Sequence, residues 1–246
     1  MNLFYHIGNY FILMARVFQR PERYNMFFRS LINEIAAIGL GSMGIVAIIS
    51  LFMGAVITLQ TASNIDSPWI PLYTVGFTTR QSVILEFSPT IIALILAGKV
   101  GSNIASEIGS MRITEQIDAL EIMGVNSASY LILPKIIAAV IINPFVIIYS
   151  MFLGIGGGWI VAELSGIVTT GQYLYGIQYD FDPFNITYAL VKTVVFAVVI
   201  TSIPAYHGYY VRGGALEVGK ASTRGVVYSS VVVLILNYVI TQIMLI

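Results

Sequence analysis

The sequence contains no cysteine, two histidines and few charged side chains. Charged residues make up 10% of its 246 residues, whereas hydrophobic residues make up 57%. Soluble domains carry about a quarter charged residues, so this composition excludes a soluble globular protein. Without cysteine there are no disulfides, thiolate metal sites or cysteine nucleophiles. His6 and His207 are far apart in the sequence and could not form a zinc site without several carboxylate ligands.

Long apolar segments dominate the remaining composition, and the mean hydropathy is +0.86. A helix needs about 20 apolar residues to cross the hydrocarbon core of a bilayer. The segment Leu164–Tyr179 is uncharged but rich in Gly, Thr and Tyr, so it is interpreted as a loop or re-entrant piece. Five transmembrane spans are predicted, at residues 35–60, 82–105, 131–160, 186–211 and 224–246.

The distribution of basic residues predicts the orientation of these spans. Ten Lys and Arg residues fall on the side of the N-terminus, and Arg80 falls on the other side with Asp66, Asp180 and Asp182. The positive-inside rule then places the N-terminus in the cytoplasm and the C-terminus outside. The ten are Arg16, Arg20, Arg23, Arg29, Lys99, Arg112, Lys135, Arg212, Lys220 and Arg224.

Residues 1–30 are predicted to form an interfacial helix and its connector. Apolar side chains recur at spacings of three and four, as in a helix lying in the membrane surface. The alternative is a disordered tail, but that would leave many aromatic side chains in water. The apolar positions are Phe4, Ile7, Phe11, Met14 and Phe18, and the polar ones are Asn2, His6, Asn9 and Arg16.

The loop between spans two and three is the most informative segment. Ile113, Ile117, Leu120 and Gly124 fall on one arc of a helix, with Thr114 as its predicted N-cap and Gly124 as its C′ residue. Three acidic residues, Glu115, Asp118 and Glu121, fall on the opposite arc. Such a helix could rest on the bilayer, yet the cytoplasmic leaflet is anionic. A protein groove lined with basic residues fits an acidic face better.

Two ionisable residues fall within predicted spans, Glu86 in span two and Lys192 in span four. A charge at the bilayer centre costs about 2.5–3.5 kcal/mol on insertion scales, so such residues are candidates for function. Both are predicted near the outer leaflet, where they could meet a lipid headgroup. Alternatively, Lys192 extends to the interface and Glu86 pairs with it for structural reasons.

The segment from Gly214 to Lys220 resembles the beginning of a phosphate-binding loop. Ala221 follows the lysine where Ser or Thr would bind Mg²⁺, and no strand is predicted before it. We therefore expect no ATP site, no cofactor and no catalytic activity in this chain. Any process in which this chain uses the energy of ATP must therefore depend on another polypeptide that binds ATP.

Three segments of the chain are more specific than its hydropathy. The longest is AGKVGSNIASEIGSMRITEQIDALEIMGVN, from Ala97 to Asn126. The others are Glu86-Phe87-Ser88-Pro89 and GKASTRGVVYSS, from Gly219 to Ser230. Together they resemble the MlaE (YrbE-type) family of ABC-transporter permeases, which move phospholipids and related lipids between bacterial membranes. The resemblance extends over the chain, so residues 1–246 are identified as a single domain of this type.

The resemblance implies an all-α integral membrane protein of the bacterial inner membrane, with an interfacial helix, five spans and a coupling helix at residues 107–125. It implies a homodimer, a cytoplasmic ATPase dimer, a periplasmic Mce-type lipid-binding protein and, in some systems, a STAS-domain protein. The predicted coupling residues are Glu107, Arg112, Thr114, Glu115, Gln116, Asp118 and Glu121.

The resemblance also implies a lipid cavity near Leu85, Glu86 and Lys192. In the family, arginine typically precedes the matching glutamate and Leu-Gly-Pro follows it. Here Leu85 and Ser88 depart from that pattern. Two other functions stay open on sequence grounds, namely a secondary transporter or channel, and a non-transporting membrane scaffold for a lipid-binding protein.

Overall fold

The computed structural model describes residues 3–19, 24–65 and 69–245. This part of the chain consists of helices and their connections without any strand, which confirms the predicted all-α class. Asn2, Arg20, Arg23 and Asp66, which the predictions above used, lie outside the described residues. Five helical segments are long and apolar enough to cross a membrane, as predicted, namely Met26–Ser63, Tyr73–Ile113, Ser127–Ser165, Phe184–Tyr209 and Ala215–Leu245.

The structure divides into two compact units, the first built from three segments of the chain and the second from two. The first comprises Met1–Gly41, Ala93–Asn143 and Val194–Ile246, and the second comprises Ser42–Ile92 and Pro144–Thr193. The helices are α1 (Leu3–Val17), α2 (Tyr24–Ser63), α3 (Tyr73–Ser82), η1 (Val83–Ile91), α4 (Ile92–Leu96), η2 (Ala97–Gly101), α5 (Ser102–Ile113), α6 (Gln116–Ile122), α7 (Ser127–Ser165), α8 (Thr170–Gln178), α9 (Phe184–Tyr209) and α10 (Ala215–Leu245).

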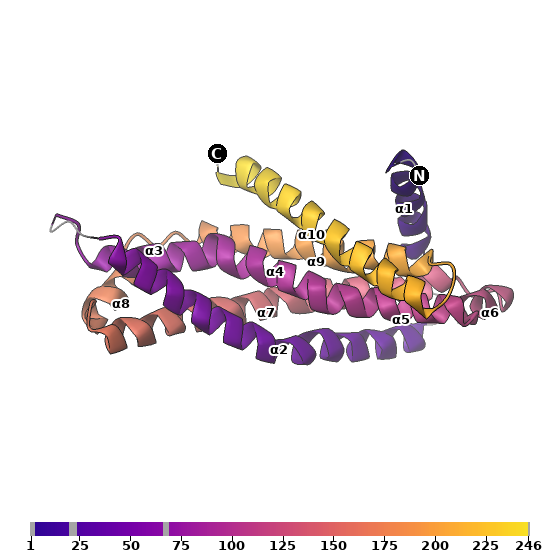
Figure 1. The fold of residues 1–246 in the computed structure, drawn as a ribbon, viewed down its shortest axis with the longest axis horizontal. Helices are drawn as coiled ribbons and strands as arrows, with labels where there is room; N and C mark the ends of the chain where they lie inside the picture. The colour runs from indigo at the N-terminus through magenta and orange to yellow at the C-terminus, as the bar shows by residue number, and fades with distance from the viewer. Residues whose placement is uncertain (1–2, 20–23, 66–68, 246) are drawn as a thin grey trace. The chain divides into compact units, whose positions relative to one another are not determined.

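In the first unit, α5 and α10 pack closely against the C-terminal part of α9 (Figure 1). A Cβ atom on Gly208 of α9 would lie 2.6 Å from the carbonyl oxygen of Ala105, and one on Gly225 of α10 would lie 2.9 Å from Cα of Pro204. Such distances are shorter than any real Cβ contact, so these positions require glycine.

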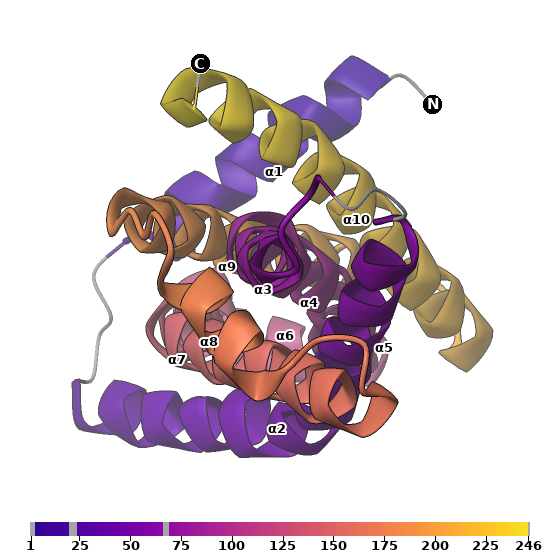
Figure 2. The same ribbon diagram turned by 90° about the vertical axis from the view of Figure 1, so that its left-hand side faces the viewer.

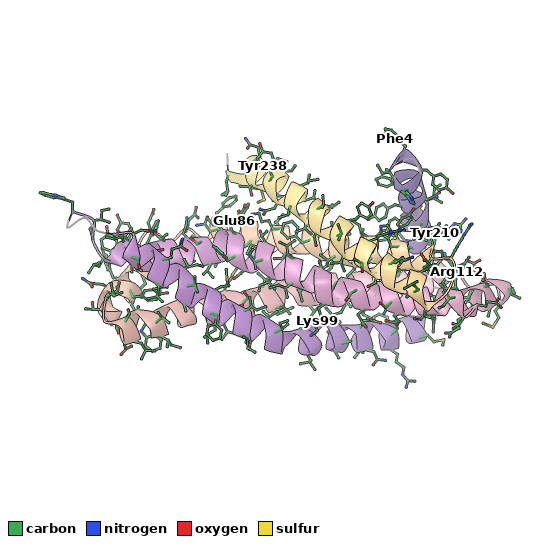
Figure 3. The ribbon with its side chains drawn as sticks, in the orientation of Figure 1. Phe4, Glu86, Lys99, Arg112, Tyr210 and Tyr238 are labelled. Atoms are coloured by element: carbon green, nitrogen blue, oxygen red, sulfur yellow. The ribbon has the colours of Figure 1, made fainter. Side chains whose placement is uncertain are left out.

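Helix α1 packs against α9 in the same unit. His6 Nδ1 lies 2.9 Å from the hydroxyl of Tyr206, and Leu13 and Val17 are fully buried. Phe4 and Phe11 are 85% and 66% exposed, and Phe4 points away from α9 (Figure 3). The predicted apolar face is therefore present, but two positions were assigned wrongly. Met14 is buried against the protein, and His6 contacts protein, because α1 has a second face that docks on α9.

In the second unit, α2 and α7 approach each other at glycines. A Cβ atom on Gly54 would lie 1.7 Å from the carbonyl oxygen of Gly154, and one on Gly157 would lie 2.2 Å from that of Leu51. Ser50 Oγ donates to Ser150 Oγ at 2.8 Å in this crossing. Backbones this close allow dispersion contacts and hydrogen bonds, which drive helix association in lipid.

The segment 164–179, predicted as a loop or re-entrant piece, contains the helix α8, which lies beside α3 (Figure 2). Thr169 and Gln172 form a capping box at its start. Burial raises the pKa of Tyr173 to about 12, so its phenol stays protonated and donates to the carbonyl of Ile155 at 3.0 Å. Arg80 of α3 donates to the carbonyls of Ile177, Tyr179 and Asp180 at the other end of α8.

The helical run between α3 and α4 widens into the π-helix η1, which carries Glu86 and Pro89. Proline has no N–H, and its ring displaces the carbonyl four residues earlier, here that of Leu85. The α-helical bond between these residues is therefore impossible. Short π-helical turns inside helices often mark functional positions.

Candidate functional site

The predicted coupling segment, residues 107–125, is divided between two helices. Helix α5 continues to Ile113, and α6 begins at Gln116 after a sharp turn at Glu115, whose φ is +60°. The prediction that Thr114 caps the second helix is wrong, because Thr114 ends α5 and donates from Oγ1 to the carbonyl of Ser110 at 2.8 Å. Gln116 Nε2 donates in turn to Thr114 Oγ1 at 3.0 Å.

Helix α6 ends in a Schellman motif. Val125 N–H donates to the carbonyl of Leu120, and Gly124 N–H donates to that of Glu121, each at 3.0 Å. Gly124 has φ +81°, a conformation that glycine adopts without strain. The prediction of Gly124 as the residue after the helix is therefore confirmed.

The outer face of α6 carries the three predicted acidic residues, and two of them have partners within the chain. Ile117 is fully buried, as expected for the inner arc. However, Asp118 pairs with Arg112 at 2.6 Å, at the end of α5 (Figure 3). Glu121 Oε1 accepts hydrogen bonds from Ser127 and Tyr209, each at 2.9 Å, so its carboxylate is held by the protein.

An exposed apolar pair at the end of α6 was missed by the sequence analysis. Ile122 is 87% exposed and Met123 is 68% exposed, and Glu115 is exposed at the other end of the helix. Ile122 and Met123 both lie in the segment 97–126 that resembles the permease family, but helical periodicity did not predict that either would be exposed. The surface available to a partner therefore contains apolar side chains at one end of α6 beside exposed Glu121, and exposed Glu115 at the other end.

Glu107 lies on α5, away from α6, and pairs with Lys135 of α7 at 2.8 Å. Lys135 also pairs with Glu34 of α2 at 2.5 Å, and its side chain is 5% exposed. No local pattern predicts this cluster, since its three members come from segments that are distant in the chain. Lys135 was predicted merely as a residue that fixes topology.

Glu86 and Lys192 form an ion pair in the second unit. Lys192 Nζ lies 2.8 Å from Glu86 Oε1 and 3.3 Å from the carbonyl oxygen of Leu85. Its ammonium group also lies 4.3 Å from the ring centroid of Tyr188, a cation–π contact. Thr90 and Tyr188 donate to the Glu86 carboxylate at 3.2 and 3.4 Å. The predicted pairing of these two residues is thus present.

The two members of this pair differ in exposure. The side chain of Lys192 is 0% exposed, whereas that of Glu86 is 43% exposed. Lys192 therefore does not extend to an interface, and Glu86 is the member that can meet a ligand. Ser88, one of the departures from the family pattern, is buried and accepts a hydrogen bond from Ser150 at 3.1 Å.

Comparison with known proteins places these features in a family. A profile of the family described as "Permease MlaE" matches residues 31–243. A "Probable ABC transporter permease protein" from Rickettsia bellii is 35% identical over 236 residues, 96% of this chain and 91% of that protein. The "Intermembrane phospholipid transport system permease protein MlaE" of Haemophilus influenzae is 31% identical over 95% of this chain and 89% of its own.

A plant protein is also similar. "Protein TRIGALACTOSYLDIACYLGLYCEROL 1, chloroplastic" from Arabidopsis thaliana is 26% identical over 94% of this chain and 66% of its own length.

Proposed function

The chain belongs to the MlaE family of ABC-transporter permeases, and from this premise we propose that it is the membrane subunit of a phospholipid transporter in a bacterial inner membrane. The observation that carries the proposal is the family match, which spans residues 31–243 and thus both sites described above. A separate ATPase dimer supplies the energy. The other proposed partners are a second copy of the chain, an Mce-type periplasmic protein and a STAS-domain protein.

In this proposal α6 is the part of the chain that docks on the ATPase. Its exposed Ile122 and Met123 supply apolar area, and exposed Glu115 supplies a negative charge. Exposed apolar side chains at a short helical tip are costly in water and favour burial in a partner's groove. Arg112 and Asp118 stay predicted coupling residues, and their mutual ion pair stiffens the turn between α5 and α6.

Co-purification tests the docking surface. The permease is expressed with its neighbouring genes, and Ile122→Glu is compared with Leu164→Glu. Leu164 is an 81% exposed leucine in the last turn of α7, at the end of that helix remote from α6. We expect Ile122→Glu to remove the ATPase from the purified complex and Leu164→Glu to retain it. Equal recovery of the ATPase with both variants, at unchanged permease yield, contradicts docking through α6.

For the lipid, we propose that Glu86 contacts the headgroup and that Lys192 holds Glu86 in place. The half-exposed carboxylate can accept a hydrogen bond from a headgroup amine or hydroxyl, whereas the buried ammonium group cannot reach a ligand. Lys192 compensates the charge of Glu86, so the pair adds no net charge at this depth. The π-helix η1 places both Glu86 and the carbonyl of Leu85 near Lys192.

Phospholipid that co-purifies with the permease measures this contact. Glu86→Ala should lower the amount of bound phospholipid, because the headgroup loses its polar partner. Glu163→Ala removes an exposed carboxylate from α7 and serves as the control. If Glu86→Ala and Glu163→Ala retain equal lipid in intact, monodisperse complexes, Glu86 has no role in lipid binding.

A further inference from the structure

The loop between α6 and α7 receives the C-terminal end of α1. The last carbonyls of a helix lack partners within the helix. Here Asn126 Nδ2 donates to the carbonyl of Arg16 at 3.0 Å, and Ser129 Oγ donates to that of Gln19 at 3.0 Å. The same Asn126 accepts from Ser129 N–H through Oδ1 at 3.3 Å, as an N-cap of α7 does. One amide side chain therefore joins the end of α1 to the start of α7.

A second set of contacts holds α6 to the same place. Ser127 and Tyr209 both donate to Glu121 Oε1, and their own oxygens lie 2.8 Å apart. Ser127 and Tyr209 are buried whereas Glu121 is exposed, so this triangle joins α6, α7 and α9 at the edge of the protein.

These polar contacts surround an open space instead of a packed core. An open cleft of about 310 Å³ lies between the end of α1 and the loop, and Glu121, Asn126, Ser127 and Tyr209 line it. Apart from these contacts, α1 is held by buried Leu13 and Val17, and α6 by buried Ile117. Helix α6 has seven residues, too few for an isolated helix to be stable in water.

We propose that Glu121 and Asn126 form a latch that makes α6 and α1 move as one body. The inference rests on the proposed function in one respect, namely that the ATPase moves α6. Glu121 is then a positioning residue that faces the chain's own Tyr209, and not an ATPase contact. Because α1 exposes Phe4, Phe11 and Phe18, a motion of α6 would reach the bilayer surface through α1.

Hydrogen exchange measured by mass spectrometry tests the latch in the permease alone, in lipid nanodiscs. The variant Glu121→Ala/Asn126→Ala should raise the exchange rate of amides in 14–19 and 116–125 roughly tenfold, since two or more hydrogen bonds are lost. Glu121→Gln retains an acceptor and should restore much of the protection of 116–125. The control Gln116→Ala removes the contact to Thr114, outside the latch, and should leave α1 unchanged.

The complete complex tests the coupling. ATP binding should alter exchange in both α6 and α1 in the unmodified complex, and in α6 alone in the Asn126→Ala variant. An equal response of α1 in both complexes, or unchanged exchange of 14–19 in the double variant without ATPase, overturns the latch. If no ATPase binds the unmodified permease, the proposed function fails, whereas the nanodisc measurement still decides whether α1 and α6 are joined.

Discussion

The crossing of α2 and α7 predicts a large effect from adding a single methyl group. In Gly54→Ala the new Cβ atom would lie 1.7 Å from the carbonyl oxygen of Gly154. Backbone cannot rotate aside as a side chain does, so the two helices must separate. Overpacking typically costs about 1–3 kcal/mol, and we expect the upper end of this range. Separation would also stretch the hydrogen bond between Ser50 and Ser150.

A matched control exists within α7. A Cβ atom on Gly156 meets nothing within 4 Å, so Gly156→Ala keeps the gain in helix propensity without the clash. In purified permease, Gly54→Ala should lower the unfolding temperature by roughly 6–12 °C relative to the unmodified chain. Gly156→Ala should leave it equal or raise it. If the fluorescence of Trp69 and Trp159 reports the same unfolding temperature for both variants, the close approach of these helices is refuted.

Further substitutions test the three buried cations Lys192, Lys135 and Arg80. Lys192→Met should destabilise the second unit less than Glu86→Leu, because the latter leaves a fully buried ammonium group unpaired, at about 3–5 kcal/mol; thermal unfolding of both variants measures the difference. Lys135→Met should lower the unfolding temperature, and adding Glu107→Gln should recover part of the loss as the carboxylate repulsion falls. Arg80→Lys should make the segment that follows α8 more sensitive to limited proteolysis, because one ammonium group cannot bind three carbonyls in the geometry of a guanidinium.

The number of spans could be predicted from the sequence because it depends on local composition. The beginning of α2 could not be predicted in this way. The apolar segment ends where Glu34 and Arg29 interrupt it, yet the helix begins earlier, at Tyr24. Glu34 is accommodated by Lys135, which lies 101 positions away in the chain. The hydropathy of a short stretch of sequence contains no information about a partner so distant in the chain.

The beginning of helix α8 could have been predicted from the sequence. Thr169 and Gln172 have the spacing of a capping box, a signal that marks the start of a helix even in a Gly- and Tyr-rich segment. Composition outweighed that signal, so the segment was predicted as a loop. The close contacts of Gly76 with Tyr173 and of Gly176 with Tyr73 explain why glycines occur here without breaking the structure.

The role of Glu121 shows where helical periodicity stops being informative. Periodicity places Glu115, Asp118 and Glu121 on one arc, and that arc was interpreted as a surface for a basic partner. In the structure, Arg112 lies against Asp118, and two hydroxyl groups bind Glu121. Two of the three carboxylates therefore have partners within the chain, although all three stay accessible. A partner can meet these carboxylates together with exposed Ile122, so affinity for the proposed ATPase should depend on buried apolar area as well as on salt concentration.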